Sequence, residues 1–171
     1  MAAGGARKVT YFTDQRGMTL AEVLIAVVII MTALLALASG IPIAGYGIQE
    51  GSQLSTATFL ANQRLEQVKA SAWTSAPAAD KVGVSASATA APQAGGVTTF
   101  PDENPVAAPY TQFTRQVRIT DCSAGAGCSG IIDAGMRQIT VTVSYQPMTG
   151  VGVAAAGSTK SAIVTMLVAQ R

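Results

Sequence analysis

A single carboxylate interrupts the longest apolar stretch of the sequence. Between Leu20 and Ile43 the only charged residue is Glu22, close to the start of the stretch. A charged side chain costs on the order of 2.5–3.5 kcal/mol at the centre of a membrane helix, and less near its end. Because anchoring alone does not require this carboxylate, we predict that Glu22 has a cationic partner.

Gly17 and Met18 stand directly before this stretch and offer a source of that partner. If the peptide bond after Gly17 is cut, a new amino group appears at Met18 and Glu22 becomes the fifth residue. Glu22 could then neutralise the Met18 amine of an adjacent subunit, since a buried charge is tolerated when it is paired. The alternative is that Glu22 lies at the membrane edge, solvated by lipid headgroups.

The sequence contains no histidine. It therefore lacks the commonest general base, the commonest metal ligand and the usual partner of a nucleophilic Ser or Cys. The Ser and Thr residues do not stand in a recognisable nucleophile motif. We predict that the protein is not an enzyme and uses no cofactor.

Two cysteines, Cys122 and Cys128, enclose a short Ser-Ala-Gly-Ala-Gly segment. In an exported domain this spacing favours a disulfide, which would contribute about 2–3 kcal/mol by loop entropy, although two free thiols remain the alternative. Two thiolates do not complete a tetrahedral metal shell, and the spacing is not the C-x-x-C of redox sites. We therefore predict neither a metal site nor a redox centre.

The positive charge of the sequence is concentrated before the apolar stretch. The net charge of +2 arises within residues 1–17, where Arg7, Lys8 and Arg16 stand against Asp14, and the rest of the chain is balanced. Basic residues in this place orient a membrane helix with its N-terminus in the cytoplasm. The 24 residues of the stretch span roughly 36 Å as a helix, enough to cross a bilayer core.

A second helical pattern follows the apolar stretch. Gly40, Pro42, Gly45 and Gly47 predict a kink or local melting over residues 40–47. Beyond it, apolar residues recur at steps of three and four, which predicts an amphipathic helix. They are Leu54, Ala57, Ala61, Leu65 and Val68, with Trp73 as a possible anchor near the end. We expect one long, interrupted helix over residues 19–71.

The C-terminal part of the chain has strand patterns. Residues 74–109 are rich in Ala, Pro, Ser, Gly and Thr and predict a long connecting loop, with a short strand around Val97–Phe100. Period-two alternation of apolar and polar residues then predicts three strands, near residues 113–120, 138–145 and 160–168. We predict an α+β fold, in which an antiparallel sheet of three to four strands packs on the amphipathic part of the helix.

Basic residues lie on or beside these strands. Arg115, Arg118, Arg137 and Lys160 could form a modest patch for an anionic surface or DNA. Solvated strand faces explain them equally well, so both interpretations stay open.

The N-terminal residues together resemble the type IV pilin superfamily, which includes major and minor pilins and the pseudopilins of type II secretion. The resemblance lies in Gly17 before the cleavage point, Glu22 as the fifth residue after it, and the apolar stretch behind. It implies cleavage by prepilin peptidase between Gly17 and Met18 and N-methylation of Met18. The residue after the cut departs from the frequent Phe of the family, and Pro42 lies slightly later than the helix-breaking Pro of many pilins.

The resemblance also implies partners and a location. These are other pilin subunits, the pilus assembly platform and the inner membrane, which a single span crosses with the head in the periplasm before the subunit enters a pilus at the cell surface. Residues 61–67 and the three strands look similar to minor pilins that prime pilus assembly, and a type II secretion pseudopilin is the alternative. A third hypothesis is a secreted binding module, released by signal-peptide cleavage before Ser39.

The predicted organisation has five parts. They are a leader (1–17), a transmembrane or filament-core helix (18–43), its amphipathic continuation (44–73), a loop region (74–109) and an antiparallel β head (110–171).

Overall fold

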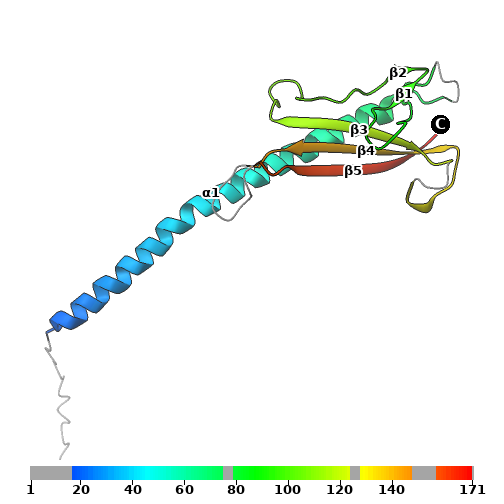
Figure 1. Ribbon diagram of the computed structural model, residues 1–171. Helices are drawn as coiled ribbons and strands as arrows, with labels where there is room; N and C mark the ends of the chain where they lie inside the picture. Colours follow the sequence, from blue (N-terminus) through cyan, green and yellow to red (C-terminus); the bar gives the residue numbers. More distant parts are fainter. Residues whose placement is uncertain (1–16, 75–78, 124–127, 148–156, 171) are drawn as a thin grey trace, which may run out of the picture. The chain divides into compact units, whose positions relative to one another are not determined.

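A computed structural model describes residues 17–74, 79–123, 128–147 and 157–170. The chain forms two compact units, which divide between Ile41 and Pro42. One helix, α1 (Leu20–Ala70), begins in the first unit and ends in the second, and strands follow it (Figure 1). The predicted leader, apart from Gly17, lies outside the described residues.

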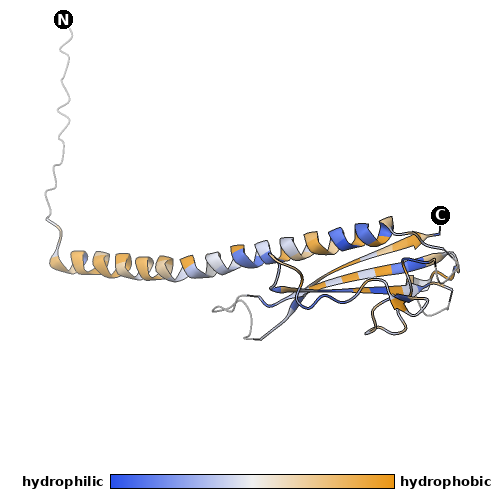
Figure 2. Cartoon of the chain, turned by 90° about the horizontal axis from the view of Figure 1, so that it is seen from above, coloured by the Kyte–Doolittle hydropathy of each residue, from blue (hydrophilic) through white to orange (hydrophobic). Residues whose placement is uncertain are grey.

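The first part of α1 is apolar on all sides (Figure 2). Its large side chains, such as Leu24, Ile30 and Leu35, are exposed to more than half of their area. Ala and Leu favour the helix over residues 33–38, whereas the Val and Ile residues before them have lower helix propensity. A helix without a polar face is typical of an apolar surrounding. By length and composition α1 can cross a membrane, although those two properties alone do not distinguish a span from a signal sequence.

The predicted melting over residues 40–47 is wrong, because α1 is helical through Gly40, Pro42, Gly45 and Gly47. Pro42 removes one amide donor and costs roughly 3 kcal/mol inside a helix. The strong helix formers before it and the packed amphipathic part after it hold both flanks of this site. The predicted single long helix is therefore confirmed, without the expected loss of helical structure.

Two antiparallel sheets follow α1. The short β1 (Gln93–Ala94) and β2 (Val97–Thr98) pair with each other, and β2 falls within the expected short strand. The larger sheet has the order β3-β4-β5, from β3 (Phe113–Asp121), β4 (Met136–Tyr145) and β5 (Lys160–Ala169). Each strand pairs antiparallel with its neighbour, so the predicted α+β fold with an antiparallel meander is confirmed.

The core lies between the inner face of this larger sheet and the second part of α1. Helix residues in it are Ala57, Leu60, Ala61, Leu65 and Val68, and sheet residues include Phe113, Val117, Ile119, Ile139, Val141 and Val143. Ala57 and Ala61 are fully buried, so small side chains allow the helix to approach the sheet closely. The sequence therefore identified most of the apolar stripe.

Leu54 was wrongly predicted to be part of that stripe. It is 47% exposed, while Leu60, which was not predicted, is 1% exposed. The half-buried side chains of Glu50 and Gln53 continue the inner face in place of Leu54. The helix face that meets the sheet thus becomes polar toward its N-terminal end.

Buried ion pairs fasten the residue 79–106 region to the core. Glu103 lies between two arginines, with Arg64 Nη2 at 2.7 Å from one of its oxygens and Arg115 Nη2 at 2.7 Å from the other. Arg115 also donates to the Leu60 carbonyl at 3.2 Å. Burial lowers the pKa of Arg64 and the charge of Arg115 lowers it further, whereas the charge of Glu103 raises it. Glu103 thus stabilises the charged form of the guanidinium.

Asp80 forms a second buried centre. It accepts hydrogen bonds from the Val82 amide at 2.9 Å and the Gly83 amide at 3.2 Å, and pairs with Arg137 Nη1 at 2.7 Å. The Arg137 guanidinium lies 4.6 Å from the centre of the Trp73 ring. Trp73 therefore anchors the end of the helical region to the sheet, as its position suggested.

The interpretation of the basic residues as solvated strand faces is wrong for Arg115 and Arg137, which are buried on the inner face. Arg118 pairs with Asp102 at 2.6 Å, and Lys160 pairs with Glu50. The hydrogen bond from Asp102 raises the pKa of Arg118. Each of the four basic residues thus has a carboxylate partner, which removes the basis for a free patch that could bind DNA.

A disulfide joins Cys122 to Cys128, with Cα atoms 5.4 Å apart. It links the residue after β3 to the first residue of the 3-10 helix η1 (Cys128–Gly130). The Ser123 amide donates to Asp121 at 2.8 Å, and this hydrogen bond lowers the pKa of that carboxyl. The turn at the end of β3 is therefore held by a covalent link and a charge-assisted hydrogen bond.

Replacing Glu103 with Gln removes the charge that Arg64 and Arg115 share. We expect the free energy of unfolding to fall by about 2–4 kcal/mol, because two poorly solvated guanidinium groups lose their counter-charge. Glu66→Gln is the matched control, since its pair with Lys69 is exposed and should matter by less than about 0.5 kcal/mol. Denaturant unfolding of the full chain in detergent, followed by fluorescence of the sole Trp, measures both; equal effects would contradict the ion-pair assignment.

Gly83 is required by its backbone conformation and by its surroundings. Its φ is +71°, and a Cβ there would lie 2.7 Å from the carbonyl carbon and oxygen of Gln93. Gly96 has a similar φ of +79° but no atom within 4 Å of a Cβ. We expect Gly96→Ala to lower the unfolding free energy by about 1 kcal/mol, and Gly83→Ala to lower it by at least about 2 kcal/mol more. Similar values for the two variants in the same unfolding measurement would show that the clash is relieved.

Candidate processing and assembly site

The residues predicted to be processed lie just outside the helix. Gly17, Met18 and Thr19 are exposed and have no regular secondary structure. Met18 is 70% exposed, and nothing lies within 4 Å of a Cβ built on Gly17. The Gly17–Met18 peptide bond is therefore free of the helical hydrogen bonds that would hide it from a protease.

Thr19 caps the helix. Its hydroxyl accepts a hydrogen bond from the Glu22 amide at 3.3 Å, and its carbonyl accepts from the same amide at 3.0 Å and from the Val23 amide at 3.2 Å. Thr followed three residues later by Glu is the sequence signature of a capping box. The sequence interpretation missed this role, although the Thr19-Leu20-Ala21-Glu22 spacing carries the signal.

Glu22 lies in the first turn of α1 and is exposed. A carboxylate here is stabilised by the positive end of the helix dipole, by about 0.3–1 kcal/mol. Among the described residues, the carboxylate oxygens have no hydrogen-bond or ion-pair partner. The backbone of Glu22 thus serves the cap, and its charged group has no partner among residues 17–74, 79–123, 128–147 and 157–170.

The other polar side chains of the apolar stretch are satisfied within the helix. The Thr32 hydroxyl donates to the carbonyls of Ile29 at 2.9 Å and Val28 at 3.0 Å, and the Ser39 hydroxyl donates to the Ala36 carbonyl at 2.9 Å. Hydroxyls that bond to their own helix can enter an apolar surrounding at little cost. Glu22 therefore differs from these polar neighbours, because its carboxylate accepts no hydrogen bond from the described part of the helix and gains only the modest stabilisation of the helix dipole.

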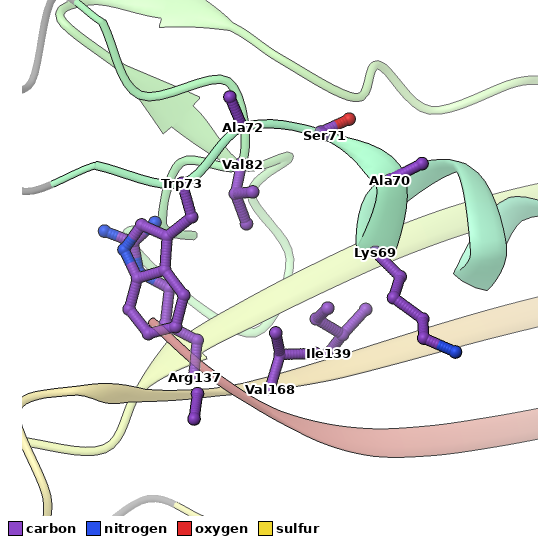
Figure 3. A pocket seen from close by; sticks show the side chains of 10 residues that line it. Lys69, Ala70, Ser71, Ala72, Trp73, Val82, Arg137, Ile139 and Val168 are labelled. Carbon is purple, nitrogen blue, oxygen red and sulfur yellow. The ribbon is translucent and has the colours of Figure 1, made fainter. Parts of the chain in front are cut away.

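A cavity of about 340 Å³ lies in the second unit, between the end of α1 and the sheet (Figure 3). Trp73, Ile139 and Val168 supply apolar walls. Most of its polar side chains have partners: Ser71 Oγ donates to the Gln67 carbonyl, Lys69 pairs with Glu66, and Arg137 Nη1 pairs with Asp80, although Arg137 Nε has no partner among the described residues. The cavity therefore does not bring together a nucleophile and a base.

No metal site is found in the part of the chain that the structure describes, since no three His, Cys, Asp or Glu side chains come together there. The two cysteines are joined to each other in the disulfide and titrate no further. The residues predicted for processing and assembly, Gly17, Met18 and Glu22, stand close together in sequence at the start of α1.

Comparison with known proteins points to the same residues. A family model described as the prokaryotic N-terminal methylation motif matches residues 13–38. The match covers the Gly17–Met18 bond, Glu22 and most of the apolar stretch. No curated protein and no solved structure matched the chain.

Removing the Thr19 hydroxyl tests the capping geometry. We expect Thr19→Ala to destabilise the first turn by about 1 kcal/mol and Thr19→Ser to leave it nearly unchanged, because Ser presents the same acceptor. Hydrogen exchange of the Leu20–Val23 amides in detergent measures the effect. Unchanged exchange in Thr19→Ala would mean that the hydroxyl does not cap the helix.

Proposed function

We propose that the chain, which carries a motif typical of type IV pilins and pseudopilins, is a minor pilin-like subunit of a type IV pilus. Prepilin peptidase cleaves it between Gly17 and Met18, and the new amine of Met18 is methylated. The subunit resides in the inner membrane as a single span, with its head in the periplasm. It is then incorporated into the filament or into the complex that primes filament assembly. Its role is structural.

The observation that carries this proposal is the isolated charge of Glu22. Thr32 and Ser39 satisfy themselves within α1, whereas the Glu22 carboxylate has no partner among the described residues. A charge on a membrane-length apolar helix is retained at a cost, and such residues are functional by default. A cation from another molecule would remove that cost.

The Met18 amine of a neighbouring subunit has the required charge and place. After cleavage it would lie next to the capping residue Thr19, at the positive end of the helix dipole, where a second positive charge is unfavourable. A carboxylate from the adjacent helix would neutralise it. The pairing thus relieves two unfavourable charges, one on each subunit.

Such a pair would also fix the position of one helix along the next. Met18 stands four residues before Glu22 and just ahead of α1, so the two residues lie a short distance apart along the direction of the helix. A neighbour whose Met18 lies level with Glu22 is therefore displaced by roughly that distance. Repetition of one displacement builds a filament with a constant rise.

A pseudopilin of type II secretion would use the same N-terminal chemistry and is the second candidate. Cleavage after Gly17 leaves 154 of the 171 residues, a generous length for the smallest pseudopilins, and this favours the minor pilin. The two candidates differ in whether loss of the gene abolishes surface pili or protein secretion.

The Glu22→Gln variant tests the proposed pairing. It keeps the size of the side chain and removes its charge, so we expect normal insertion and cleavage. Incorporation into sheared filaments should fall at least about tenfold, because the neighbour's amine is left unpaired in an apolar bundle. Immunoblots of sheared and membrane fractions give the ratio.

Glu66→Gln is the matched control, because it removes a carboxylate from an exposed position of the same helix. It should incorporate normally, and Glu22→Asp should recover part of the lost incorporation. Full incorporation of Glu22→Gln would refute the pairing. Secretion of a fragment that begins at Ser39, in the wild type and in Glu22→Leu alike, would instead identify a secreted module.

A further inference from the structure

The two edges of the larger sheet differ. The β3 edge is covered by preceding residues: Glu103 and Arg115 form an antiparallel bridge, the Ser85 amide donates to the Ile119 carbonyl at 2.8 Å, and the Val106 amide donates to the Phe113 carbonyl at 2.9 Å. β5 pairs with β4 on one side, and within the described ranges no segment pairs with its other side. The backbone amides and carbonyls of that side lack partners in this part of the chain.

Apolar side chains of β5 are also incompletely covered on both faces. The inward side chains of β3 and β4 are buried, whereas Val164, Met166 and Val168 on β5 are only half-buried. On the outer face Ile163 is 61% and Leu167 36% exposed. The same edge therefore offers unpaired backbone groups and apolar surface above and below them.

Natural edge strands are usually protected by charges, by Pro, by bulges or by being short. β5 is ten residues long and pairs with β4 in unbroken register from Lys160 opposite Tyr145 to Ala169 opposite Met136. Its one charged residue, Lys160, stands at the first position and is paired with Glu50. The edge has none of the usual protection along the remaining nine positions.

We propose that the outer edge of β5 is a docking site for an extended apolar strand of a different polypeptide, which adds antiparallel to the sheet as a fourth strand. Backbone pairing would satisfy the free amides and carbonyls, as in other cases of strand addition. Alternate side chains of the incoming strand would cover Val164 and Met166 on the inner face and Ile163 and Leu167 on the outer face.

The partner is a different chain because of the direction of β5. Lys160, at the start of β5, contacts Glu50, and Val168, near its end, lines the same cavity as Lys69. The second part of α1 and β5 therefore run in the same direction, which Figure 1 also shows. Two copies paired antiparallel through β5 would have their helices in opposite directions. Copies anchored in one membrane cannot do this, so the choice of partner rests on the proposed function.

The chemistry of the incoming strand follows from the same residues. Lys160 is already paired with Glu50, and the residues from Ile163 to Val168 are uncharged. The edge therefore favours an incoming strand without charged side chains. A segment of roughly six to ten residues, rich in β-branched or other apolar side chains and extended before binding, fits this edge. Other subunits that carry the N-terminal methylation motif in the same cell are the probes.

Hydrogen exchange of the full chain tests the proposal. The detergent-solubilised chain is measured alone and after co-purification with each of those subunits in turn. With the correct partner, about half of the β5 amides, those on the outer side, should exchange at least about tenfold more slowly, because only backbone pairing protects alternate amides. The amides of β4 should not change.

Ile163→Lys and Gln116→Lys form a matched pair of variants. Both positions are exposed on the outer face, and both face Thr142 across the sheet, from β5 and from β3 respectively. Ile163→Lys should abolish the protection, since the incoming strand would bury an unpaired charge, and Gln116→Lys should retain it. Equal behaviour of the two variants would overturn the proposal.

Two further outcomes also count against it. Unchanged β5 exchange with every subunit would exclude strand addition, and protection of the chain alone that grows with its concentration would identify a second copy as the occupant. The intact mass of the same samples shows whether the chain has been cleaved before Met18. It therefore tests the proposed processing separately from the proposed strand addition. A chain that begins at Met18 but gains no protection refutes the edge proposal alone, and a protected chain that is never cleaved refutes the processing alone.

Discussion

The contact between the second part of α1 and the inner face of the β3-β4-β5 sheet is the interaction on which the head depends. A sheet with one apolar face must bury it, and the chain supplies one helix for the purpose. Ala57 and Ala61 let the two layers approach, while Leu60 and Val68 fill the space beside them. Because one helix covers β3 and β4 better than β5, the uneven burial of the third strand is a consequence of the same packing.

The two parts of α1 have different surroundings, and the residue composition of each part differs accordingly. Its first part is apolar on every side, with Thr32 and Ser39 bonded to their own backbone, as an apolar surrounding demands. Its second part presents one stripe to a sheet and polar residues elsewhere. Glu22 fits neither pattern, because it places a charge near the start of the apolar part of the helix. Departures of this kind are expected at functional positions. We attribute the presence of Glu22 to subunit assembly.

Periodicity was enough to predict the helix, the three long strands and their antiparallel order, because these depend on repeating patterns of apolar residues. It failed where one side chain decides the outcome. Leu54 has the spacing of the stripe, yet Gln53 and Glu50 occupy the face, and Glu50 pairs there with Lys160. Arg115 and Arg137 lie inward because Glu103 and Asp80, distant in sequence, neutralise them. For the N-terminal site, the spacing of Gly17, Met18 and Glu22 predicts processing and pairing, and both stay predictions. The Thr19 cap could have been predicted from the Thr-x-x-Glu spacing but was overlooked.

Processing between Gly17 and Met18 is the central claim, because without the new amine Glu22 has no counterpart. The most direct test is the intact mass and terminal sequence of the protein from membrane and sheared-filament fractions. The account predicts that both fractions begin at Met18 and carry one additional methyl group on its amine. A protein that retains Met1, or one that begins at Ser39, would contradict it.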